Sequence, residues 1–149
     1  MTADDLQVFI KATTQYFDTL SGSQPAEMGV PYVQDKKFEV LDYTGIIGIS
    51  GANRGCIYFT ASKAMLKDVG RLFLNGEEQP DEELADLIGE IANMISGNAR
   101  RTFGENFQIS VPIAIEGRPL NIKTLCSLPA FAIPIKWQDH EAFLVVCLN

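Results

Sequence analysis

Apolar side chains recur at steps of three and four residues in three stretches of the chain, which predicts three helices. The first follows a cap at Thr2 or Asp4 and ends at Gly22, and the second covers residues 62–73. The third is the longest and covers residues 81–103. We predict Asp81 as its N-cap, with Gly104 ending it.

Alternating or continuous apolar runs predict five strands. We expect them at residues 39–50, 54–60, 107–116, 130–137 and 141–148. Turn residues at 51–53 join the first two strands into a hairpin. Residues 23–37 carry two prolines and are predicted to be an irregular connection, and prolines 112, 119, 129 and 134 indicate edges, bulges or bends in the second half.

Helices alternate with groups of strands in this order, which favours an α+β fold with a mostly antiparallel sheet covered by helices on one face. The length of 149 residues is typical of one domain, and we expect residues 1–149 to form it. The last strand is almost wholly apolar, so we expect it to be buried on both faces. Either the rest of the chain or strand pairing across a dimer would supply that burial.

The formal net charge of −7, with 12 basic and 19 acidic residues, argues against a nucleic-acid-binding surface. His140 is the only histidine, which excludes a site with two histidine ligands, and it is expected in a solvated turn. Cys56, Cys126 and Cys147 form no CxxC pair and are expected to be reduced thiols. The chain has no apolar run long enough to span a membrane and no signal pattern, so we expect a cytoplasmic protein that does not bind membranes.

One face of the third helix is polar. Asp86, Glu90, Asn93 and Gly97 follow at steps of four, three and four residues, opposite the apolar face. Glycines at positions 89 and 97 make the helix less stable than alanines would. Their presence suggests a flat helix surface that another protein can approach closely. The spacing alone also fits ordinary solvated side chains at Glu90 and Asn93.

This helix, Asp86-x-x-x-Glu90-x-x-Asn93 followed by Met94-Ile95-Ser96-Gly97-Asn98-Ala99, resembles the signature helix of the CheC/CheX family of chemotaxis phosphatases. Residues 9–13, the hairpin segments 44–51 and 55–59, and residues 109–112 are similar to further family segments in the same order. The resemblance is strongest to the single-site, CheX-like branch. The stretch between Asn93 and Pro112 is a few residues shorter than the family pattern.

The resemblance implies a CheC-like fold and hydrolysis of the aspartyl phosphate on a CheY-like receiver domain. It implies that Asn93 orients the attacking water and that Glu90 pairs with the receiver's lysine. Asp86, Gly97 and Pro112 would contact the partner. The resemblance also implies a homodimer and no cofactor of the chain's own, since the Mg²⁺ would belong to the receiver.

A non-catalytic binding module that docks a signalling partner is the alternative. Glu90 and Asn93 speak against that alternative, whereas the shortened approach to Pro112 speaks for it.

Overall fold

The computed structural model describes residues 1–20, 24–34, 40–73, 76–118 and 129–148. In these ranges the elements are α1 (Ala3–Asp18), β1 (Glu27–Met28), β2 (Tyr32–Gln34), β3 (Tyr43–Gly51), β4 (Gly55–Ala61), α2 (Lys63–Phe73), the 3-10 turn η1 (Asp81–Glu83), α3 (Leu84–Phe103), β5 (Phe107–Ile109), β6 (Ile113–Glu116), β7 (Ala130–Trp137) and β8 (His140–Leu148).

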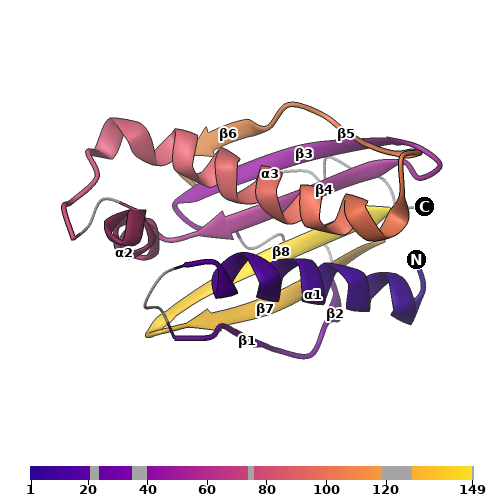
Figure 1. Ribbon diagram of the computed structural model, residues 1–149, viewed down its shortest axis with the longest axis horizontal. Helices are drawn as coiled ribbons and strands as arrows, with labels where there is room; N and C mark the ends of the chain where they lie inside the picture. Colours follow the sequence, from indigo (N-terminus) through magenta and orange to yellow (C-terminus); the bar gives the residue numbers. More distant parts are fainter. Residues whose placement is uncertain (21–23, 35–39, 74–75, 119–128, 149) are drawn as a thin grey trace.

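The strands form one antiparallel sheet in the order β1-β7-β8-β4-β3-β5, with β2 also paired to β7 and β6 also paired to β3. Figure 1 shows α1 and α3 side by side on one face of this sheet, with α3 over β3 and β4 and α1 over β7 and β8. The α+β class, the antiparallel sheet and the long helix are therefore confirmed.

Helix caps account for three of the predicted boundaries. The hydroxyl of Thr2 accepts a hydrogen bond from the backbone N–H of Asp5, whose carboxylate in turn accepts one from the N–H of Thr2. Ser62 caps α2 by accepting from the N–H of Met65 at 3.1 Å. At the end of α3, Gly104 has φ of 98°, a conformation that favours glycine.

The start of the third helix differs from the prediction. Asp81 begins the 3-10 turn instead of capping α3, and its carboxylate binds the ammonium groups of Lys63 and Lys67 on α2. Glu83 occupies the N-cap position without a side-chain hydrogen bond. The two ammonium groups of α2 thus bind the carboxylate that was predicted to cap α3, and these ion pairs link α2 to the start of α3.

Two strand predictions also change. The connection predicted as irregular contains β1 and β2, which add to the outer side of β7; Pro134 lies in β7 between the two short pairings. The predicted strand 107–116 is interrupted at residues 110–112, so β5 and β6 pair with different parts of β3. The hairpin begins at Tyr43, and the predictions for Gly22, residue 39 and Pro119 fall outside the described residues.

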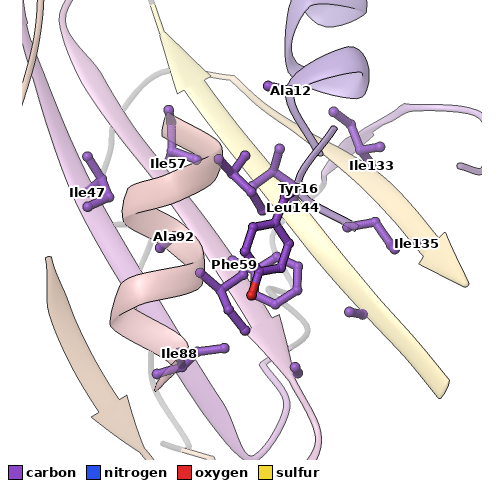
Figure 2. Close-up of a cluster of buried hydrophobic side chains, with 14 of the residues drawn as sticks. Ala12, Tyr16, Ile47, Ile57, Phe59, Ile88, Ala92, Ile133, Ile135 and Leu144 are labelled. Atoms are coloured by element: carbon purple, nitrogen blue, oxygen red, sulfur yellow. The ribbon is translucent and has the colours of Figure 1, made fainter. Parts of the chain in front are cut away.

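The main core lies between the two helices and the sheet. Figure 2 shows Ile88 and Ala92 of α3 and Tyr16 of α1 above the sheet residues Phe59 and Leu144. Gly45 on β3 allows α3 to approach closely, since a Cβ there would stand 2.5 Å from the carbonyl oxygen of Ile88. This contact fixes the distance of α3 from the sheet.

Strand β8 lies between β7 and β4, so burial of its apolar residues is completed within the chain.

His140 is more enclosed than expected: its Nε2 lies 2.6 Å from the carboxylate of Asp68, and its ring stacks on Trp137. The expectation of reduced thiols holds for Cys56, which is free and buried, but is wrong for Cys147, which is disulfide-bonded; Cys126 lies outside the described residues. Sequence spacing cannot reveal which thiols the fold brings together.

Candidate functional site

The predicted site residues on α3 all face away from the sheet. Asp86, Glu90 and Asn93 are exposed, while Ile88 and Ile91 between them are buried in the core. A helix packed along its whole length on a sheet holds its outer side chains on a rigid base, with about 1.5 Å of rise per residue. Glu90 and Asn93 therefore stand about one turn apart on the solvent side of a fixed scaffold.

The two interior glycines have different surroundings. Gly89 is buried, and a Cβ there would make ordinary contact with Pro112, at 3.5 Å from its Cβ. Gly97 is half-buried, and a Cβ there would meet nothing within 4 Å. Gly97 therefore leaves open space above the helix, and Pro112 lies beside the turn that carries Glu90.

The segment that carries Pro112 is anchored to β3. The N–H of Ser110 donates to the carbonyl of Gly48 at 2.9 Å, and the N–H of Gly48 donates to the hydroxyl of Ser110 at 2.8 Å. This pair of hydrogen bonds holds the bend between β5 and β6 against the sheet edge. Pro112 thus reaches α3 although this stretch is shorter than the family pattern.

Large apolar side chains are exposed around the polar residues of α3. Met94 follows Asn93 on the helix and is 41% exposed, and Val111 and Ile113 on either side of Pro112 are 84% and 62% exposed. Apolar groups gathered beside a polar motif are typical of protein–protein contact surfaces. This apolar surface could not be predicted from the sequence, because the exposure of a Val-Pro-Ile segment depends on where the fold places it.

Tyr16 on α1 lies close enough to feel the charge of Glu90. Burial raises the pKa of the Tyr16 phenol well above its usual range, and the Glu90 carboxylate raises it further. The phenol is therefore neutral at physiological pH and presents an uncharged neighbour to Glu90.

A cleft opens at the C-terminal half of the exposed stripe. It has a volume of about 450 Å³ and lies over Gly97, between Asn93 and the turn that follows α3. Its lining includes Asn93, Met94, Gly97, Arg100, Arg101 and Glu105. The Nε of Arg100 donates to the carbonyl of Phe107 at 3.0 Å and so fixes this turn.

Metal-ligating side chains do not cluster in the part of the chain that the structure describes: no three His, Cys, Asp or Glu residues lie together there in a way that would hold an ion. None of the described helices combines the length and apolar character that a membrane crossing needs.

A family model described as "Chemotaxis phosphatase CheX" matches residues 43–136, which is more than half of the chain. The chain belongs to the CheX family of chemotaxis phosphatases. The match spans the hairpin, the whole of α3, the bend at Pro112 and most of β7. No sequence among the curated proteins matches this CheX-family chain.

Solved structures of CheX proteins share the fold over the full length. CheX from Desulfovibrio desulfuricans is 31% identical, with 98% of this chain and 99% of that chain covered and a TM-score of 0.86. CheX from Vibrio vulnificus is 25% identical, with 99% and 100% covered and a TM-score of 0.86. A Borrelia burgdorferi structure titled as a CheX-CheY-BeF3-Mg complex matches in fold at 23% identity, 99% coverage of both chains and a TM-score of 0.81.

The structure brings all five predicted site residues to one side of the molecule. Asp86, Glu90, Asn93 and Gly97 share the outer face of α3, and Pro112 lies beside that helix at Gly89.

Proposed function

We propose that this CheX-family protein hydrolyses the aspartyl phosphate of a CheY-like receiver domain, with Glu90 and Asn93 as the residues that enter the receiver's site. The observation that carries the proposal is the exposure of this carboxylate and carboxamide one turn apart on a helix braced by the sheet. The CheX–CheY complex known from Borrelia burgdorferi supports a receiver as the partner.

Asn93 is suited to orient water. Hydrolysis of an acyl phosphate passes through a loose, in-line transition state, so that positioning of the nucleophile is the main task of the catalyst. A carboxamide offers one acceptor and two donor hydrogens, and it does this without a change of protonation. In the proposed reaction, water attacks phosphorus, the phosphorus–oxygen bond to the aspartate breaks, and inorganic phosphate leaves.

Glu90 is assigned the docking of the receiver's cationic side chain. Its carboxylate is exposed and its neighbour Tyr16 is neutral, so a cation from the partner meets an accessible negative charge. An ion pair at this point fixes the register of the two proteins and holds Asn93 over the phosphoryl group. Asp86, one turn earlier, extends the acidic surface to the rim.

The apolar side chains of Met94, Val111 and Ile113 supply contact area beside the polar pair. The Mg²⁺ that assists phosphoryl transfer belongs to the receiver in this proposal, and no cofactor of this chain takes part.

The test follows the decay of a phosphorylated receiver from the same genome, loaded with acetyl phosphate, with and without this protein. We expect the parent protein to accelerate decay and Asn93→Ala to lose about two orders of magnitude or more of that acceleration, as for other water-orienting groups. Glu90→Ala should lower binding and rate together.

Asn106→Ala and Glu27→Ala are the matched controls, because both side chains are exposed and neither lies on α3: Asn106 is in the turn after the helix, and Glu27 is on β1 at the other end of the sheet. Equal acceleration by Asn93→Ala and Asn106→Ala would overturn the assigned site. Binding of the phosphorylated receiver without any acceleration would instead establish the non-catalytic docking module.

A further inference from the structure

The charge of the exposed α3 face changes sign along the helix. Asp86 and Glu90 lie before Asn93, whereas Arg100 and Arg101 lie after it, at the cleft. With about 100° and 1.5 Å per residue, these side chains share one side of the helix, and Arg101 stands about 12 Å beyond Asn93 along the axis. The face is thus acidic at one end and basic at the other.

Among the described residues, Arg101 shares with Lys11 on α1 and Lys136 on β7 the absence of an ion pair, and of these three cations it is the one that lines the cleft. Lys63, Lys67, Arg71 and Arg118 each pair with a carboxylate. For Arg101, the described residues provide neither an ion pair nor a hydrogen bond, and its side chain is exposed.

The cleft next to Arg101 is open to an incoming group. Gly97 places no side chain on its floor, and Arg100 is held aside by its bond to the carbonyl of Phe107. Glu105 is the single carboxylate among the lining residues, against two guanidinium groups. A negatively charged side chain of a partner therefore finds room and a net positive surrounding here.

We propose that this cleft, with Arg101 as its specificity-determining residue, binds a carboxylate side chain on the receiver surface near the phosphorylation site. The proposal rests on the function proposed above. With Asn93 at the phosphoryl group, Arg101 lies too far along the helix to reach that group and meets the neighbouring receiver surface instead. The two charged ends of the face then permit one orientation of the partner, because the reverse orientation would bring like charges together.

The experiment measures the rate of receiver dephosphorylation against receiver concentration for the parent protein, Arg101→Gln and the control Lys136→Gln. Arginine and glutamine have similar helix propensities, so the substitution removes the charge and preserves the helix. Lys136 is an exposed cation on β7, across the sheet from α3.

We expect Arg101→Gln to raise KM by about three- to fivefold, as for a charge at an interface rim, with kcat within about twofold of the parent. The difference should disappear at about 0.5 M salt because the charges are then screened. Lys136→Gln should match the parent throughout.

A charge swap identifies the partner group. Arg101→Glu should weaken docking further, and exchange of one receiver carboxylate for lysine should restore it. Identical KM values and salt dependence for Arg101→Gln and Lys136→Gln, or a loss confined to kcat, would overturn the inference. Failure of the parent protein itself to accelerate decay would instead overturn the proposed function.

Discussion

Replacement of Gly97 by alanine should make the protein more stable and less active. Glycine inside a helix costs about 1 kcal/mol relative to alanine. The added methyl group meets nothing within 4 Å, so no steric penalty opposes the gain. We expect the free energy of unfolding to rise by up to about 1 kcal/mol, which corresponds to about 2–4 °C in Tm for a chain of this size.

The same methyl group stands on the floor of the cleft between Asn93 and Arg101. If the partner packs directly against Gly97, the added methyl group would push it away from the helix by an appreciable fraction of the methyl group's size. Catalysis that depends on the position of one water molecule is sensitive to such a shift, and a displacement of about 1 Å can cost up to about 10²-fold. We expect kcat/KM for the phosphorylated receiver to fall by about tenfold or more.

Urea denaturation measures the first effect, and receiver dephosphorylation measures the second. Gly89→Ala is the matched control: it gains the same helix propensity, but its methyl group is buried in ordinary contact with Pro112. This control should be more stable at unchanged activity. If Gly97→Ala kept full activity, docking would not require the absence of a side chain at position 97. Destabilisation of the same variant would refute the helix reasoning.

Three further predictions concern the scaffold. Gly45→Ala should lower the free energy of unfolding by about 1–3 kcal/mol in urea denaturation, because its Cβ would overlap the carbonyl of Ile88; an unchanged midpoint would contradict the close packing. Lys63 and Lys67 lower the pKa of Asp81 to about 2, so its stabilising contribution is present above the unfolded pKa of about 4 and is lost as the pH falls toward 2. Asp81→Asn should therefore be less stable than the parent at pH 7 and equal to it near pH 2, and parallel curves over this range would argue against the linkage. We also propose a homodimer and a single domain over residues 1–149: light scattering at micromolar concentration should give twice the chain mass, and a mass of one chain would refute the dimer.

Local patterns predicted most of the helices and the long strands. The period of α3 depends only on neighbours three and four residues away, so its length and its buried face were visible in the sequence. The short strands β1 and β2 were not, since they contain two and three residues and exist only through pairing with β7. Asp81 was misassigned because a capping residue and an ion-pair partner have the same sequence signature.

In the candidate site, too, the features that depend on helical spacing could be predicted from the sequence, and those that depend on distant parts of the chain could not. Helical spacing placed Asp86, Glu90, Asn93 and Gly97 on one face without reference to the rest of the chain. The position of Pro112 beside Gly89 could not be predicted in this way, because it depends on how the bend between β5 and β6 returns to α3. The cleft at Arg101 was equally hidden, because the turn after α3 forms one of its walls.

Under the proposed function, the outer face of α3 is one half of an enzyme site. Its polar side chains are exposed, and their chemistry requires a phosphoryl group, a cation and exclusion of bulk water, all of which a docked receiver would supply. The chain's own contribution is then rigidity and orientation: the sheet and Gly45 hold the helix, and the acidic and basic ends of the face select how the partner lies on it. It follows that substitutions at Asn93 and at Arg101 should differ in kind. The first should slow the reaction in the assembled complex, and the second should change how often, and at what salt concentration, the correct complex forms.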